Sequence, residues 1–180
     1  MTRPRIKQGL VQVFTGDGKG KTSAALGIAL RAIGWGLRVC IVEFIKGYEA
    51  TGEIKIAERF AGQYEIRQFA TDPTCYIDEA KAQQRKIECE AAMAYAEEVV
   101  KSEEFDVVIL DEINNAMGYS LIEVARVLEL IRERPPHVEL ILTGRRAPQS
   151  IVDAADLVTE MRLIKHPFEK GIPARRGLDY

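Results

Sequence analysis

Apolar residues along this chain follow two patterns. Some form short continuous runs, and others recur every three or four positions. The short runs predict strands, and those that are apolar throughout predict strands buried on both faces of a sheet. We expect strands at residues 10–15, 37–44, 64–69, 107–110, 138–143 and 157–163. The longer repeats predict helices between them. The first helix is expected to end near Gly34, and the others to lie at residues 54–60, 77–102, 120–134 and 148–155.

Strands that alternate with helices predict an α/β fold, a mostly parallel sheet with helices on both faces and right-handed crossovers. Gly34 is expected to cap the first helix at its C-terminus. Ser120 and Glu123 have the spacing of a capping box, which is expected to open the helix over residues 120–134. Since no linker-like stretch divides the chain, we expect one domain over residues 9–180 after a flexible arm at residues 1–8.

Composition places the chain among ordinary soluble globular proteins. Of its 180 residues, 47% are hydrophobic and 29% are charged, and the net charge is −2. This charge argues against a strongly basic surface for nucleic acid. The three cysteines, Cys40, Cys75 and Cys89, have no metal-type spacing, so we expect free thiols in a reducing cytosol. No apolar run is long enough to cross a membrane, and a cytoplasmic protein is predicted.

A glycine-rich turn joins the first predicted strand to the first predicted helix. In a phosphate-binding loop, glycines let backbone N–H groups converge on an anion, and the helix N-terminus adds a positive dipole end. Lys21 can reach phosphate oxygens, and Thr22 can offer its hydroxyl to Mg²⁺. The residues predicted to bind phosphate are Gly16, Asp17, Gly18, Lys19, Gly20, Lys21, Thr22 and Ser23.

The loop departs from the usual spacing at one position. A glycine normally stands five residues before the glycine of Gly-Lys-Thr, and here Thr15 occupies that position. The nearest glycine is Gly16, so the loop is one residue short. A tighter loop encloses phosphates differently, and chemistry at the γ-phosphate therefore does not follow from the motif alone.

Polar residues follow several of the other predicted strands. In parallel sheets, ligands bind outside the carboxyl ends of the strands, where Lys46, Asp111, Glu112, Thr143 and Arg145 are expected. A carboxylate of Asp111 or Glu112 can complete a Mg²⁺ site with Thr22. Taken alone, these residues indicate an α/β protein that binds a magnesium nucleotide, and they do not name a second substrate.

Several other candidates keep two interpretations. Arg145 and Arg146 could neutralise a polyphosphate or pair with surface carboxylates. His166 could act in catalysis, although a structural role is favoured because nothing nearby in sequence marks it as a base. The cysteines are interpreted as core or incidental residues, with Cys75 in a loop.

The final segment of the chain, residues 165–180, resembles the ending of the P-loop ATP:corrinoid adenosyltransferases, with Lys-His-x-Phe near its start and Gly-Leu-Asp-Tyr at its end. Other matching segments follow in family order at residues 16–23, 44–47, 52–53, 110–112 and 143–145. The resemblance covers the chain from residue 9 to the terminus. It implies a P-loop NTPase-like, RecA-like sheet.

The resemblance also implies a reaction. These enzymes transfer the 5′-deoxyadenosyl group of ATP to the Co(I) of a corrinoid (cobyrinic acid a,c-diamide, cobinamide or cobalamin) and release triphosphate. Residues 16–23 would then cradle the triphosphate, with Lys46 beside it, and Lys19, Lys21 and Arg145 would be the catalytic positive charges. Thr22 with Asp111 or Glu112 would hold Mg²⁺, or Mn²⁺ in its place. Co(I) is itself the nucleophile, so no general base is implied.

This sequence departs from the family in two places. Family members often carry a Phe-x-Trp pattern after the third strand, on the corrinoid side, whereas residues 73–76 here read Pro-Thr-Cys-Tyr. Tyr76 is therefore expected to supply that apolar face. The N-terminal arm is shorter than in members whose arm covers the partner subunit. A homodimer and a reductase or flavodoxin-type electron donor are expected by resemblance.

Two other classes of function compete with this interpretation. One is a kinase or NTPase that acts at the γ-phosphate, and the other is a RecA-like, nucleic-acid-dependent module. The negative net charge weighs against the second. The product separates adenosyl transfer, which releases triphosphate, from phosphoryl transfer, which releases ADP.

Overall fold

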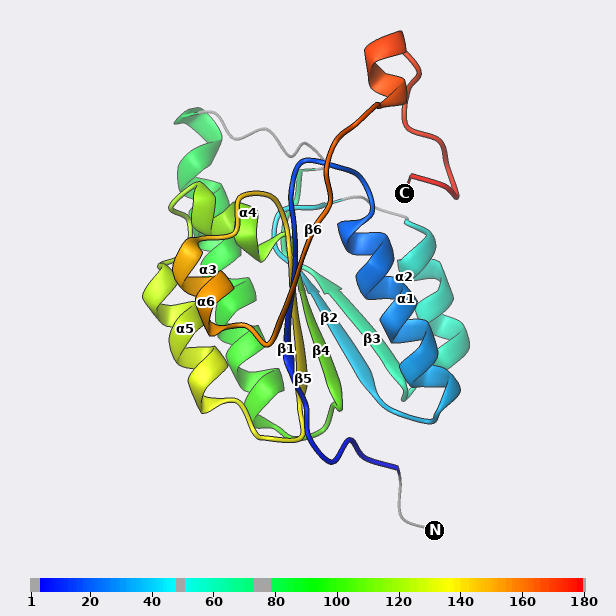
Figure 1. Ribbon diagram of the computed structural model, residues 1–180, viewed down its shortest axis with the longest axis vertical. Helices are drawn as coiled ribbons and strands as arrows, with labels where there is room; N and C mark the ends of the chain where they lie inside the picture. The colour runs from blue at the N-terminus through cyan, green and yellow to red at the C-terminus, as the bar shows by residue number, and fades with distance from the viewer. Residues whose placement is uncertain (1–3, 48–50, 73–78, 180) are drawn as a thin grey trace.

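The computed structural model describes residues 4–47, 51–72 and 79–179 and contains one parallel sheet (Figure 1). Its six strands have the order β3-β2-β4-β5-β1-β6. They are β1 (Val11–Thr15), β2 (Val39–Glu43), β3 (Tyr64–Gln68), β4 (Val107–Asp111), β5 (Glu139–Thr143) and β6 (Leu157–Glu160). All six predicted strands are thus confirmed, each with bounds within a few residues of those expected.

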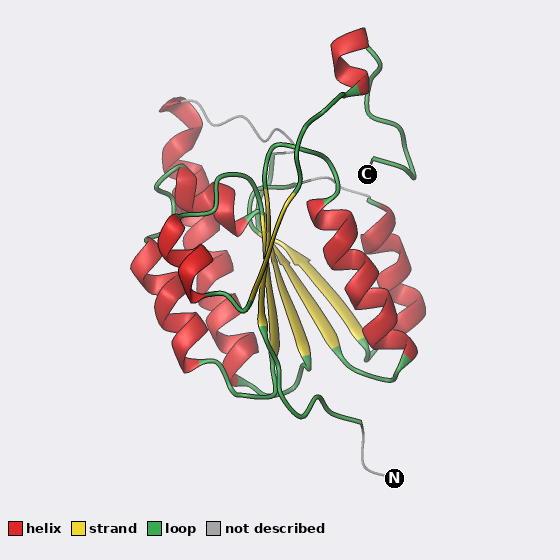
Figure 2. Ribbon diagram, viewed as in Figure 1, coloured by secondary structure: helices red, strands yellow, loops and turns green. Residues whose placement is uncertain are grey.

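The helices are α1 (Lys21–Gly34), α2 (Gly52–Ala57), α3 (Glu79–Lys101), α4 (Ile113–Gly118), α5 (Val124–Glu133) and α6 (Gln149–Ala154). Two 3₁₀ turns, η1 (Glu58–Phe60) and η2 (Pro167–Lys170), complete the described elements. Helices α1 and α2 cover one face of the sheet, and α3 to α6 cover the other (Figure 2). The predicted three-layer α/β arrangement is confirmed.

The strands bury their two faces in two separate cores. Along β4, Val108 and Leu110 point into the core beneath α3 to α6, whereas Val107 and Ile109 point into the core beneath α1. This alternation follows from the two-residue repeat of a strand. Strands β2, β4 and β5 are buried along their whole length, which explains their continuous apolar runs.

Three local predictions need correction. The capping box at residues 120–123 does not form: α5 begins at Val124, its N-cap Glu123 makes no side-chain hydrogen bond, and Ser120 adopts a left-handed φ of 55°. The short helix α4, which the sequence pattern did not predict, precedes it. At the end of α1, the left-handed residue is Gly36 (φ 76°) rather than Gly34, and Gly36 donates its N–H to the Ile33 carbonyl.

The parallel register brings the carboxyl ends of the strands to one edge of the sheet. Glu43 is paired with Asp111 across β2 and β4, and Thr15 with Glu160 across β1 and β6. The chain after β6 continues beyond this edge and then turns back toward it (Figure 1). The described part of the N-terminal segment lies at the opposite edge, where Gly9 N–H donates to the Pro136 carbonyl at 2.8 Å. The flexibility predicted for residues 1–8 stays a prediction.

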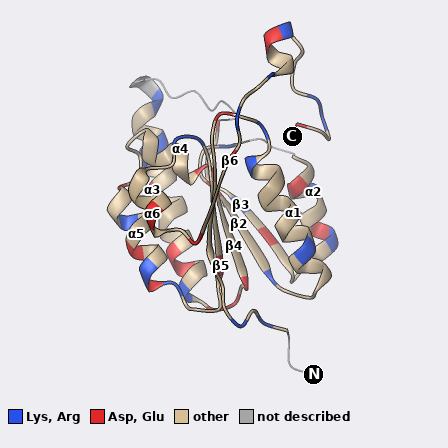
Figure 3. Cartoon of the chain, in the orientation of Figure 1, with Lys and Arg blue, Asp and Glu red and all other residues tan. Residues whose placement is uncertain are grey.

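Charged side chains of both signs occur on the outer helices and at both ends of the sheet, while the middle of the sheet is mostly uncharged (Figure 3). Among the described helices, none combines the length and the apolar character that a membrane crossing needs.

Candidate active site

The predicted phosphate loop lies between β1 and α1, against the end of β6. Gly16 and Gly20 have φ values of 94° and 123°, which side-chain-bearing residues rarely adopt. A Cβ atom on Gly16 or Gly18 would lie 2.5 or 2.7 Å from the Met161 carbonyl oxygen. Gly18 N–H also donates to that oxygen at 2.7 Å. The loop therefore needs glycine both for its backbone angles and for its contact with Met161.

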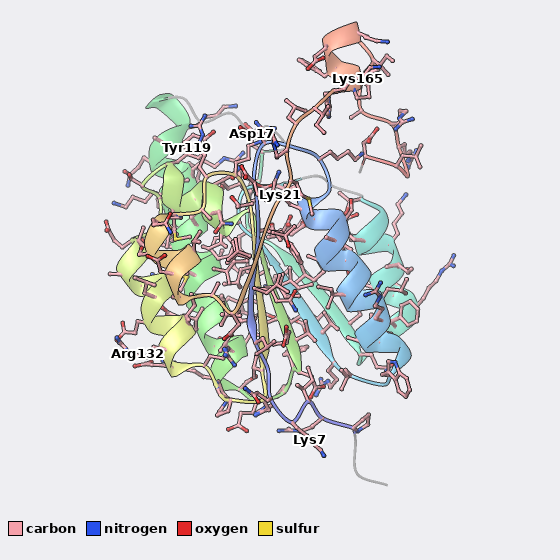
Figure 4. All side chains as sticks on the ribbon, viewed as in Figure 1. Lys7, Asp17, Lys21, Tyr119, Arg132 and Lys165 are labelled. Carbon is pink, nitrogen blue, oxygen red and sulfur yellow. The ribbon has the colours of Figure 1, made fainter. Side chains whose placement is uncertain are left out.

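Lys21 is the first residue of α1, and its side chain folds back over the loop. Its Nζ donates to the carbonyl oxygens of Gly16 and Gly18 at 2.7 and 2.8 Å. Only 8% of Lys21 is exposed, and burial lowers the pKa of its ammonium group. Lys21 and Asp17 lie at the carboxyl end of the sheet, far from Lys7 (Figure 4).

Asp111 is at the centre of a polar network at the strand ends. Its Oδ1 accepts hydrogen bonds from the hydroxyls of Thr22 at 2.9 Å and Thr143 at 2.6 Å. Its Oδ2 accepts from Lys46 Nζ at 2.7 Å, and Lys46 also donates to Thr22 Oγ1 at 2.8 Å. Burial opposes the charge on Lys46, but the carboxylates of Asp111 and Glu112 outweigh it and raise the pKa of its ammonium group.

Glu112 is the second carboxylate at the strand ends, and one of its oxygens accepts no hydrogen bond from the described residues. Its backbone is left-handed (φ 65°), and its N–H donates to Thr143 Oγ1 at 3.0 Å. Among the described residues, its buried Oε2 has no hydrogen-bond partner, and its Oε1 lies 3.7 Å from Lys46 Nζ. Burial and the neighbouring Asp111 raise the pKa of its carboxyl group.

These oxygens fit Mg²⁺, which is usually held by one or two carboxylates together with substrate phosphates. Glu112 Oε2 can contact a cation directly, and Lys46 Nζ links Glu112 to the Thr22 hydroxyl, since it lies 3.7 Å from Glu112 Oε1 and 2.8 Å from Thr22 Oγ1. Both oxygens of Asp111 already accept hydrogen bonds, so Asp111 suits an indirect role. Within the described residues there is no cluster of three or more His, Cys, Asp or Glu side chains, which is the arrangement of an all-protein cage.

Arg145 follows β5 and is held by an asparagine pair on α4. Its N–H donates to Asn115 Oδ1, and Asn114 Nδ2 donates to the Gly144 carbonyl at 3.3 Å. The guanidinium lies 4.0 Å from the Asp17 carboxylate, and both side chains are more than half exposed. Asn114 and Asn115 were not among the predicted site residues, because a helix of six residues leaves no clear periodic signal in the sequence.

The C-terminal segment, residues 174–179, lines the cavities beside the phosphate loop. Lys19 Nζ donates to the Leu178 carbonyl at 3.0 Å and forms an ion pair with Asp179. Two cavities of about 390 and 350 Å³ adjoin the loop here. Both are lined by Lys19, Lys21, Glu112, Ala174 and Asp179. Lys46 lines the first cavity, and Arg145 and His166 line the second.

The structure thus brings together the loop residues 16–23, Lys46, Asp111, Glu112 and Arg145, as expected from the strand ends. His166 caps η2, where its Nδ1 accepts a hydrogen bond from Phe168 N–H at 3.2 Å. Tyr76 and Cys75 lie outside the described residues. Asp179 belongs to the segment that carries the family resemblance, but spacing alone gave no sign that it meets Lys19.

The sequence profile described as ATP:corrinoid adenosyltransferase BtuR/CobO/CobP matches residues 7–180. The chain belongs to this adenosyltransferase family. A corrinoid adenosyltransferase of a Sinorhizobium species is 41% identical over 97% of this chain and 81% of its own length. The corrinoid adenosyltransferase CobA of Salmonella typhimurium is 36% identical over 97% of this chain and 87% of its own.

Solved structures that resemble this adenosyltransferase are informative about its fold and not about its activity. The flagellar accessory protein FlaH of Methanocaldococcus jannaschii superimposes with a TM-score of 0.57 at 13% identity, over 86% of this chain and 72% of its own. A KaiC-like protein of Pyrococcus horikoshii gives 0.51 at 16% identity, over 85% and 72%. These likenesses confirm the predicted P-loop NTPase-like architecture.

Proposed function

We propose that this chain is an enzyme that transfers the 5′-deoxyadenosyl group of ATP to the Co(I) of a corrinoid and releases triphosphate. The observation that carries the proposal is the family match along residues 7–180. The short phosphate loop agrees with it, because the reacting atom is C5′ of the ribose and the leaving group is the whole triphosphate.

In this reaction the Co(I) electron pair forms a bond to C5′ while the C5′–O bond breaks, and its electrons leave with triphosphate. The protein's task is to position C5′, exclude water and stabilise the departing charge. Lys19, Lys21 and Arg145 oppose that charge around the loop, and Lys46 adds a fourth cation. Lys21 and Lys19 would exchange their contacts with carbonyls and Asp179 for phosphate oxygens.

We infer that Mg²⁺ takes part, with Glu112 and Thr22 as its protein ligands and Asp111 orienting Thr22 and Lys46. When bound, the cation would neutralise charge on the leaving triphosphate. Mn²⁺, which accepts the same oxygen ligands, is expected to replace it.

The competing proposal, phosphoryl transfer at the γ-phosphate, is not favoured by the family match. One experiment separates the two. The protein is incubated with ATP, Mg²⁺ and chemically reduced cobalamin, and the absorbance spectrum is followed for a Co–C bond while the phosphate products are resolved. We expect adenosylcobalamin and triphosphate in equal amounts. ADP without a Co–C bond would reject adenosyl transfer.

Tyr76 is proposed to provide an apolar face that displaces the lower ligand of the corrinoid. Tyr76→Ala should then retain most of its rate with chemically generated Co(I) and lose it with Co(II) plus a biological reductant. Equal losses with both cobalt states would reject this role.

The remaining features of the proposal concern the enzyme's surroundings. A homodimer and a reductase or flavodoxin-type electron donor are proposed from the family resemblance alone. A cytoplasmic location is proposed from the cysteines, of which Cys40 and Cys89 are free and buried. Light scattering would test the dimer.

A further inference from the structure

Helix α3 carries a buried guanidinium that the proposed chemistry does not use. Only 1% of Arg85 is exposed, and 5% of its ion-pair partner Glu88, one helical turn away. Arg85 Nη1 lies 3.3 Å from Glu88 Oε2. A buried ion pair often adds little to stability compared with apolar residues of similar volume, so its role is better sought in what else the two side chains bind.

Arg85 binds the backbone at the ends of two neighbouring strands. Its Nη1 donates to the Ile45 carbonyl after β2 at 3.3 Å, and its Nη2 donates to the Asp72 carbonyl after β3 at 2.7 Å. Glu88 continues this contact, since its Oε1 accepts hydrogen bonds from the hydroxyl and the N–H of Thr71 at 2.6 and 3.3 Å. Cys89 Sγ donates to the preceding carbonyl, that of Phe44, at 3.7 Å.

The two segments that Arg85 joins are also packed against each other. A Cβ atom on Gly47 would lie 2.4 Å from the Ala70 carbonyl oxygen, so the chain after β2 lies directly on the chain after β3. Lys46 stands between Ile45, which Arg85 holds, and Gly47, which Ala70 confines. The backbone on both sides of Lys46 is therefore fixed, while its Nζ reaches Thr22 and Asp111.

We propose that the Arg85–Glu88 pair is a positioning device for Lys46. By holding the Ile45 carbonyl, it sets the place from which the Lys46 ammonium reaches the triphosphate and the metal-binding network. The planar fork of arginine is needed because a single side chain must donate to two carbonyls and a carboxylate in different directions. This inference rests on the proposed role of Lys46 in nucleotide binding.

A double-mutant cycle tests the proposal. Arg85→Met with Glu88→Gln removes both buried charges at similar volume, and we expect it to lower kcat/KM for ATP about 10- to 100-fold, as misplacement of a positioning group does. If the pair acts through Lys46, adding Lys46→Ala should give the same loss as Lys46→Ala alone. The cycle is repeated with ATP dissociation constants from calorimetry. Arg85→Lys, which keeps the charge but loses the fork, serves the same cycle if the paired variant does not fold.

Arg126→Met is the matched control. Arg126 also binds two glutamates of α3, Glu90 and Glu97, but it makes no hydrogen bond or ion pair with the chain after β2 among the described residues. Its loss should leave kcat/KM within about twofold, because its partners Glu90 and Glu97 do not belong to the proposed nucleotide site. The positioning role would be overturned if the loss in the combined variant equals the product of the separate losses, both in kcat/KM and in the ATP dissociation constant. A wild-type enzyme that binds ATP but forms no Co–C bond would instead reject the proposed function, and the calorimetric cycle would still decide the role of Arg85.

Discussion

At the scale of single residues, the polar side chains of the candidate site hold one another in place. Asp111 accepts hydrogen bonds from Thr22, Thr143 and Lys46. Such mutual contacts fix the direction of each donor before a substrate arrives, which is the condition for electrostatic stabilisation at low reorganisation cost.

Lys21→Ala should abolish turnover. It removes a fixed positive charge next to the proposed triphosphate, which costs roughly 3 kcal/mol or more in the transition state. Stopped assays with reduced cobalamin measure the loss, and circular dichroism checks the fold. Lys7→Ala, on the opposite end of the sheet (Figure 4), is the control and should keep full activity. A folded Lys21→Ala protein with near-normal rate would contradict the assigned role.

Changes at Asp111 and Glu112 should have different effects. Glu112→Gln removes the open carboxylate oxygen, so we expect a higher Mg²⁺ concentration for half-maximal activity and a maximal rate that excess Mg²⁺ largely restores. Asp111→Asn breaks the contacts to Thr22 and Lys46, and its lost rate should not return with Mg²⁺. Titration of Mg²⁺ in both variants measures this. Unchanged metal dependence in both would place the metal elsewhere.

At the scale of elements, strands were easier to predict than short helices and caps. The runs at β2, β4 and β5 are apolar because both faces of these strands are buried, so the sequence carries their signal directly. Ser120 and Glu123 match a capping pattern, but the turn after α4 places Ser120 in a left-handed conformation instead. Only the tertiary contacts of α4 distinguish these outcomes.

The site was predictable where it depended on strand ends and the glycine loop. Lys46, Asp111, Glu112 and Arg145 could be expected together, because parallel strands end at one edge. The contacts that orient them could not. Asn115 and Arg85 act through backbone groups far away in sequence, and Asp179 meets Lys19 only because the chain turns back after β6.

Removal of residues 174–180 should separate activity from stability. Every described residue of this segment is exposed as a whole, although the Asp179 side chain is 19% exposed, and the segment lines both cavities. Its removal should therefore change the free energy of unfolding by less than about 1 kcal/mol. We expect kcat/KM to fall at least about tenfold, because water then reaches the proposed nucleotide site. Urea titrations measure the free energy of unfolding, and initial rates measure kcat/KM. Unaltered kcat/KM would show that the segment is dispensable.

At the scale of the whole molecule, the sheet separates two closed cores. Cys40 of β2 and Cys89 of α3 lie in the same core, and burial raises the pKa of both thiols to about 12. Unfolded thiols ionise near pH 9, so these two groups make the free energy of unfolding fall as pH rises from 9 toward 12.

Chemical labelling should report this burial. In a Cys75→Ser variant, a thiol reagent at pH 8 should leave Cys40 and Cys89 unmodified in the native protein and modify both after denaturation, because the thiolate is the reactive form. Mass spectrometry counts the labels. Rapid labelling of the native variant would mean that the core opens readily.

The contact between Lys19 and Asp179 also bears on how the protein should be handled. A purification tag or fluorescent protein fused after residue 180 would begin two residues after Asp179, whose side chain forms an ion pair with Lys19 of the phosphate loop. A fusion at the amino end would precede a segment whose described part lies at the opposite edge of the sheet (Figure 1). Carboxyl-terminal fusions should therefore bind ATP more weakly until a protease removes them, and amino-terminal ones should not. A dye attached at residue 175, which lines the second cavity, should report nucleotide binding.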